Sequence, residues 1–140
     1  MTIPLAIENE QEASVAILLS CMIGQDQHEI DHQFRHLTLM LAASQKFQHH
    51  SFEFMVKKAM SLLAAYGNKA VIEFCAPFIP DNFKETLFAM TCELLTGNGE
   101  LTETESEVLG IVALCLGISI ELMRVMIATF LMRNRWNVRT

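Results

Sequence analysis

The chain has 140 residues, of which 51% are hydrophobic and 19% are charged. This length suits one domain whose core needs neither metal nor disulfides, and the composition is too apolar for a disordered chain. Its 16 acidic and 10 basic residues give a formal net charge of -6, which argues against nucleic acid as a partner because a negative molecule repels the phosphate backbone.

Apolar residues recur at helical spacing in nearly every segment and strict alternation is absent, which predicts an all-α fold. In the first half we expect helices over about 10–23, 31–45, 50–66 and 69–75. Gly24 is placed to end the first helix, Asp31 to cap the second and Gly67 to end the third. The first helix is apolar on several sides, so we expect it to lie at the centre of the fold.

The second half predicts three more helices, over about 81–95, 102–116 and 120–133. Pro77 and Pro80 bracket a turn through which a helix cannot continue. Residues 96–99 form the clearest loop, because glycine and asparagine tolerate positive φ. Thr102 and Glu105 match a capping box at the start of the next helix. Short links between about seven helices predict a bundle, not a coiled coil.

The four cysteines lie in apolar runs and none forms a C-x-x-C pair; they are Cys21, Cys75, Cys92 and Cys115. We expect buried free thiols, which suit a reducing compartment. The sequence does not open with a basic segment, an apolar core and a cleavage site. Its longest apolar stretches are about half of the roughly 20 residues that a membrane span needs. These features predict a soluble, cytoplasmic protein without a transmembrane segment.

An internal repeat relates residues 10–67 to residues 81–138 through an ungapped shift of 71 positions. Residues 16–21 then fall on 87–92, and residues 29–31 fall on 100–102. Few aligned positions are identical, but each half has the order helix, acidic loop, helix, short link, helix. We therefore expect one domain over residues 1–140, built from two pseudo-symmetric helical halves.

One stretch of the chain resembles the TerB-like family of tellurite resistance. It consists of the segment from Leu94 to Glu105, LLTGNGELTETE, followed by Ile111-Val112-Ala113 and Leu116-Gly117-Ile118. The family signature is a helix running into Asp-Gly-x-apolar-x-x-x-Glu and then an apolar helix ending in Leu-Gly. Residues 78–83 are also similar. The resemblance implies a seven-helix bundle with a pseudo-twofold axis, found in bacterial tellurite-resistance and stress-response systems. It also implies acidic, metal-binding surfaces and contacts with membrane-associated protein partners.

The resemblance places a divalent-cation site at the two acidic inter-helix segments, with candidate ligands Asp26, Glu29, Asn98, Glu100 and Glu105. The chain departs from the family pattern, because Asn98 stands at the family's aspartate and the equivalent positions of the first half hold Gln27 and Phe34. A hard cation such as Ca²⁺ usually takes two or more carboxylates. Glu105 also has a second interpretation, as the carboxylate of the capping box.

A second candidate site is a histidine pair one helical turn apart, His32 and His36. The 71-residue shift places Glu103 and Glu107 at the matching positions. Imidazoles spaced i, i+4 can chelate a transition metal, and two carboxylates could complete a four-ligand site. On a helical wheel both pairs point away from the apolar stripes of their helices. They form a site only if the two helices flank one groove, and are otherwise surface residues.

Enzymatic motifs are missing: there is no G-x-S-x-G, no Gly-x-x-x-x-Gly-Lys loop, no His-Glu-x-x-His and no dinucleotide-binding glycine run. We therefore expect a non-catalytic interaction module of a stress-response system, with a metal or oxyanion binder and an unrecognised enzyme as alternatives. Nine methionines and nine phenylalanines could fill the core or line an adaptable groove for a protein partner. A homodimer would form where Phe52 and Met123 extend outward.

Overall fold

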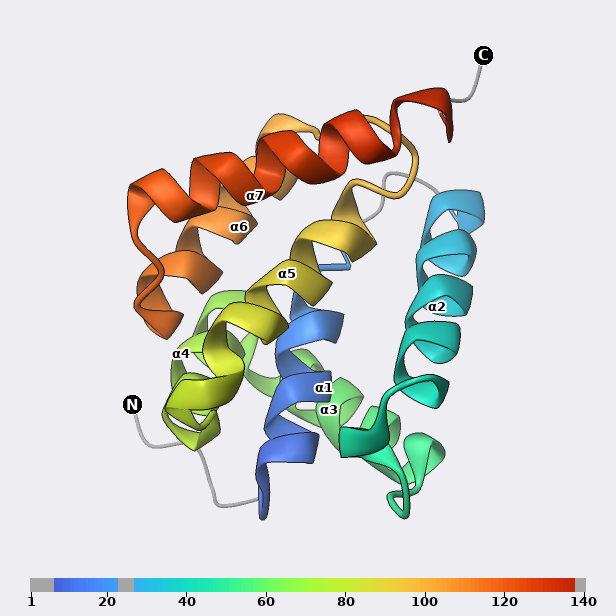
Figure 1. The fold of residues 1–140 in the computed structure, drawn as a ribbon. Coiled ribbons are helices and arrows are strands. Elements are labelled where there is room, and N and C mark those ends of the chain that lie inside the picture. The colour runs from blue at the N-terminus through green and yellow to red at the C-terminus, as the bar shows by residue number, and fades with distance from the viewer. Residues whose placement is uncertain (1–6, 23–26, 138–140) are drawn as a thin grey trace.

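The fold is described from a computed structural model, over residues 7–22 and 27–137. These residues form seven α-helices and no β-strand, which confirms the expected all-α class (Figure 1). The helices are α1 (Glu10–Ser20), α2 (Gln27–Ala42), α3 (Phe52–Tyr66), α4 (Asn68–Cys75), α5 (Lys84–Leu95), α6 (Glu103–Leu116) and α7 (Ile120–Arg133). Short 3-10 turns are η1 (Gln45–Phe47), η2 (Ala76–Phe78), η3 (Asp81–Phe83) and η4 (Arg135–Asn137).

Helix α1 is the central element, as its sequence predicts. All nine residues from Glu12 to Ser20 are buried, and α3, α4 and α5 pack around them (Figure 1). A helix that is apolar on every side is stable only when other elements cover it completely. Ser20 fits this interior because its hydroxyl donates to the carbonyl oxygen of Ala16.

A buried ion pair ties α3 to the start of α1. The Nζ of Lys58 lies 3.0 Å from Oε1 of Glu12, and the same oxygen accepts a hydrogen bond from the backbone N–H of Glu8. Both side chains are largely buried. An unpaired charge at this depth is costly, so each side chain depends on the other.

The described helices follow the order that the 71-residue shift requires, with α1–α3 and α5–α7 as the corresponding sets and α4 between them. Superposition of the two halves stays a prediction.

Helix α2 begins at Gln27, four residues before the expected cap, and Asp31 instead accepts a hydrogen bond from Nε2 of Gln27 within the helix. The segment before Asp31 holds no helix breaker, and Glu29 in the first turn suits the helix dipole.

The capping box predicted at the start of α6 is confirmed. Thr102 and Glu105 form the capping box of α6, and Gly117 ends that helix with φ 72°. Ser119 then caps α7 by accepting from the backbone N–H of Leu122. Helices α6 and α7 both pack on α5. Within the described ranges, no helix has the combination of length and apolar character that a bilayer crossing requires.

The cysteines are free, and Cys21, Cys75 and Cys92 are buried as predicted. Burial raises the pKa of the thiols of Cys75 and Cys92 to about 12, and it raises the pKa of Cys21 as well, with a further contribution from Cys92. Since the thiolate is the reactive form, these core thiols are held inert. Cys115 on α6 is only partly buried.

Helix α7 is apolar but lies on the surface, and none of its residues is fully buried. Its inner side, including Met123 and Phe130, packs against the core. Its outer side exposes Val125 and Met132. Phe52 on α3 is also partly buried against the core, so both residues suggested for a homodimer face are partly covered, and the homodimer stays a prediction.

Candidate functional site

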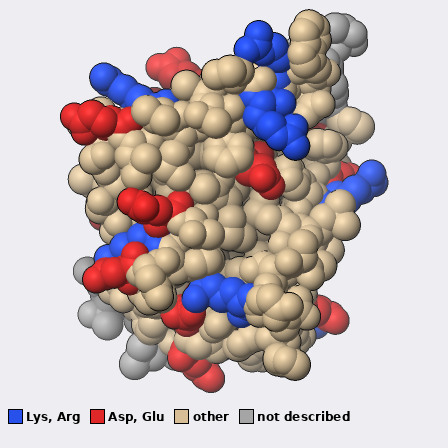
Figure 2. Space-filling model, viewed as in Figure 1, with Lys and Arg blue, Asp and Glu red and all other residues tan. Residues whose placement is uncertain are grey.

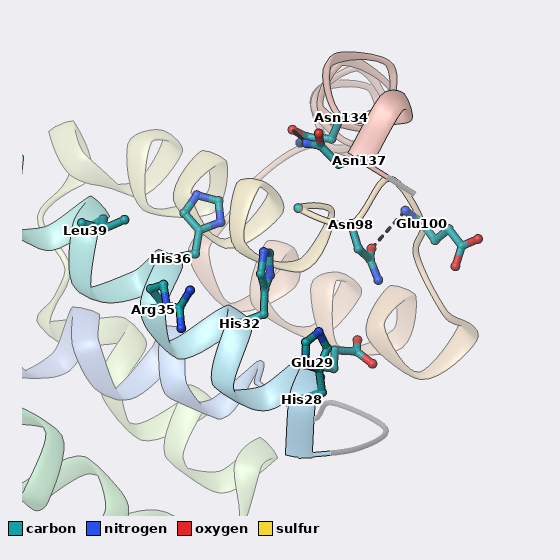
Figure 3. A pocket seen from close by; sticks show the side chains of 11 residues that line it. His28, Glu29, His32, Arg35, His36, Leu39, Asn98, Glu100, Asn134 and Asn137 are labelled. Carbon is teal, nitrogen blue, oxygen red and sulfur yellow. Dashed lines mark hydrogen bonds between the residues drawn. The ribbon is translucent and has the colours of Figure 1, made fainter. Parts of the chain in front are cut away.

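A cleft of about 720 Å³ lies between α2, the loop after α5 and the C-terminal turn η4. We call it the α2 cleft. One wall is α2, which contributes three histidines at a spacing of four residues, His28, His32 and His36. The opposite wall comes from the loop, at Gly97, Asn98 and Glu100, and from η4 and the residue before it, at Asn137 and Asn134. Arg35 and Leu39 also line it (Figure 3).

The histidines share a wall because residues four apart lie on one face of a helix. His36 is the most firmly held of them: its Nε2 lies 3.1 Å from Oε2 of Glu93 on α5. Its ring also lies against Gly97, where an added Cβ would come within 3.3 Å of Nδ1. Gly97 therefore lets the loop approach α2 closely. His32, one turn earlier, is exposed and projects on the cleft side of α2 (Figure 3).

Carboxamide hydrogen bonds fix the opposite wall. The Oδ1 of Asn98 accepts from the backbone N–H of Glu100 at 3.1 Å, which closes the loop. The Nδ2 of Asn134 donates to the carbonyl oxygen of Phe130 at 3.0 Å and lies 3.4 Å from Oγ1 of Thr96. These bonds hold both segments, so the cleft is formed by groups that are already ordered.

Three of the five predicted oxygen ligands line the α2 cleft: Glu29, Asn98 and Glu100. Glu29 lies in the first turn of α2, whereas Asn98 and Glu100 lie in the loop between α5 and α6, so the fold brings together residues about 70 positions apart in sequence. The carboxylate of Glu100 points away from His32 (Figure 3). Asp26 lies outside the described residues.

Glu105 lies elsewhere, in the interior between α2 and α6. Glu105 is only 2% exposed. Oε1 accepts from the backbone N–H of Thr102 at 3.0 Å, and Oε2 accepts from Nε2 of Gln33 on α2 at 3.3 Å. The capping-box interpretation of Glu105 is therefore the one that the structure supports.

The sequence analysis missed Gln33. It is only 5% exposed and links α2 to α6 through Glu105. Its Oε1 is buried and has no hydrogen-bond partner among the described residues. Its position in the sequence could have indicated that Gln33 is buried, because it lies four residues before Leu37 and eight before Leu41. These three are the buried residues of α2.

The second predicted set is divided between two places. His32 and His36 line the α2 cleft, while Glu103 and Glu107 are exposed on α6 and do not line it. The carboxylate beside His36 is that of Glu93. In the part of the chain that the structure describes, no three His, Cys, Asp or Glu side chains are grouped closely enough to hold a metal ion.

Comparisons of the chain with protein-family models, with curated proteins and with solved structures found no match. The cleft is therefore interpreted from its own groups. Three imidazoles line one wall, and the carboxylate of Glu93 lies beside one of them, that of His36. Nitrogen and oxygen donors of this kind suit transition-metal ions better than Ca²⁺ or Mg²⁺. Its volume lies within the range of roughly 300 to 1,000 Å³ typical of ligand sites.

Proposed function

We propose that this chain is a non-catalytic binding module of the TerB-like type, whose α2 cleft takes up one divalent transition-metal ion. The observation that carries the proposal is the position of His36, which lies 3.1 Å from Glu93 and one helical turn from His32. The proposed ligands are Nε2 of His36, the carboxylate of Glu93 and the imidazole of His32. Water completes the coordination.

The contact between His36 and Glu93 suits a metal because it joins a nitrogen donor that lines the α2 cleft to an oxygen donor beside it. The two side chains are 30% and 42% exposed, so an ion can reach them without unfolding. Zinc ligands lie about 2.0 to 2.2 Å from the metal, and an ion placed between the two groups replaces their direct hydrogen bond. The three side chains are not grouped for a metal in the described structure, so the proposal requires the exposed His32 to change its rotamer when the ion binds.

Two imidazoles among three ligands favour Zn²⁺, Ni²⁺ or Cu²⁺, and disfavour Ca²⁺, which prefers six or more oxygen ligands. The proposed ligand set differs from the acidic site that the TerB-like resemblance implies. Glu29, Asn98 and Glu100 line the same cleft, but in this proposal they are not ligands.

Titration calorimetry of the full chain with Zn²⁺, Ni²⁺ and Ca²⁺, after chelator treatment, tests the site. We expect one Zn²⁺ or Ni²⁺ per chain, and an affinity at least about tenfold lower in His36→Ala and Glu93→Gln, which corresponds to about 1.4 kcal/mol. The control is His50→Ala, since His50 is exposed and outside the cleft. Absence of stoichiometric binding, or an equal loss in the control, would contradict the proposal.

The proposed role as an interaction module of a bacterial tellurite-resistance or stress-response system rests on the TerB-like resemblance. The loop and capping box at residues 96–105 support it, as does the seven-helix order. The proposed partner is a membrane-associated protein that contacts the metal-loaded cleft. Partner capture from the native host should therefore require Zn²⁺ and fail with His36→Ala. Capture that is equal with and without the metal would refute this role.

A further inference from the structure

Five exposed residues form a seam along the outer side of α7 and into η4: Glu121, Val125, Ala128, Met132 and Arg135. Their separations of four, three, four and three residues match a heptad pattern. The first four lie on one face of α7, and Arg135 follows in η4, where its Nε lies 3.4 Å from the carbonyl oxygen of Met132. Val125 and Met132 are 61% and 58% exposed. Uncharged side chains cover most of the surface over α7 (Figure 2).

The order of residues along this seam is self-complementary. It begins with an acidic residue, Glu121, passes through three apolar residues and ends with a basic one, Arg135. When two such seams run antiparallel about an axis through Ala128, Glu121 of each copy meets Arg135 of the other. Val125 meets Met132, and Ala128 meets Ala128, whose small side chain lets the helices approach. The same seam in a parallel arrangement would place like charges together.

We propose that α7 is the interface of an antiparallel homodimer with twofold symmetry. A symmetric dimer requires one patch to be complementary to itself, and the sequence of charges and apolar residues on this seam meets that requirement. An interface with a different protein would not need this self-complementarity. Burial of Val125 and Met132 from both copies supplies the apolar contact, and the paired charges set the antiparallel direction.

The interface is small. The 14 residues of α7 span about 21 Å, which covers less than the roughly 800 Å² per partner of a standard interface. The dimer is therefore weak and depends on concentration. None of the seam residues lines the α2 cleft, although Arg135 belongs to the turn η4 whose Asn137 does.

Sedimentation velocity from about 5 to about 500 µM, in the presence of chelator, tests the interface at concentrations suited to a weak complex. We expect the single reversals Glu121→Arg and Arg135→Glu each to raise the dissociation constant about tenfold or more. The double reversal should restore it to within about threefold of wild type, since the seam is again self-complementary. Glu53→Arg, on α3 at the other side of the molecule (Figure 1), controls for the change in net charge.

A monomer at every concentration would overturn the proposal, and so would a dimer that the single reversals leave unchanged. If the dimer of the double-reversal variant is as weak as the dimers of the single variants, the antiparallel pairing is disproved. Mild oxidation of Ala128→Cys gives a second test that does not depend on charge. The thiols of two copies then meet at the axis and should form a disulfide-linked dimer, whereas wild type and Ala64→Cys, at an exposed position on α3, should not.

Discussion

Replacing Glu105 with alanine should destabilise the fold strongly, although the residue is acidic and begins a surface helix. The substitution removes one half of the capping box at the backbone N–H of Thr102 and the buried hydrogen bond from Gln33. Loss of a cap costs about 1 kcal/mol, and loss of a buried hydrogen bond to a charged group costs about 1.5 to 3 kcal/mol. We therefore expect the free energy of unfolding to fall by about 3 kcal/mol.

Urea denaturation followed by circular dichroism measures this change, with Glu103→Ala as the matched control. Glu103 is also in the first turn of α6 but is exposed, so its loss should cost less than about 0.5 kcal/mol. The double variant Gln33→Leu with Glu105→Leu should be less destabilised than the sum of the single variants, because neither polar group is left without a partner. A Glu105→Ala variant as stable as Glu103→Ala would refute the reasoning.

Three further predictions concern the core and the cleft. Lys58→Ala leaves the buried carboxylate of Glu12 without its ammonium partner, so the free energy of unfolding in urea should fall by about 3 kcal/mol. Lys57→Ala, at an exposed position, should leave it nearly unchanged. Equal losses in the two variants would contradict this prediction. In the native protein at pH 8, a thiol reagent should modify at most Cys115. Burial raises the pKa of the other three thiols and keeps them protonated. Rapid labelling of a second cysteine, detected by mass spectrometry, would show that the core opens. Gly97→Ala should displace the ring of His36 by a few tenths of an ångström and weaken Zn²⁺ binding about threefold without unfolding the chain; unchanged affinity would mean that the ring position does not matter.

Local signals predicted much of this fold. The capping box depends on a few neighbouring residues, and Thr102 and Glu105 form it where the sequence placed it. The start of α2 was misplaced because Asp31 has the chemistry of a cap but lies within a segment that continues the helix toward Gln27. Capping preference is a weak guide when no breaker precedes the cap.

The candidate site was only partly predictable. Spacing alone placed His32 and His36 on one face of a helix, and the repeat brought Glu29 and Glu100 into comparison. The partnership of His36 with Glu93 depends on how α2 packs against α5, which no local pattern encodes. Gln33 was overlooked for a similar reason: a polar residue on an apolar stripe is recognised as buried only when its partner, Glu105, is known.

The burial of α1 on all sides has a consequence for synthesis on the ribosome. The helices that enclose it, α3, α4 and α5, follow it in the chain and end with Leu95. At about 5 to 20 residues per second, the interval from Ser20 to Leu95 lasts roughly 4 to 15 s. During that interval the nascent chain carries an apolar helix without its neighbours. Its first helix is thus a natural binding site for chaperones, and this domain can complete its folding only after more than half of it has been translated.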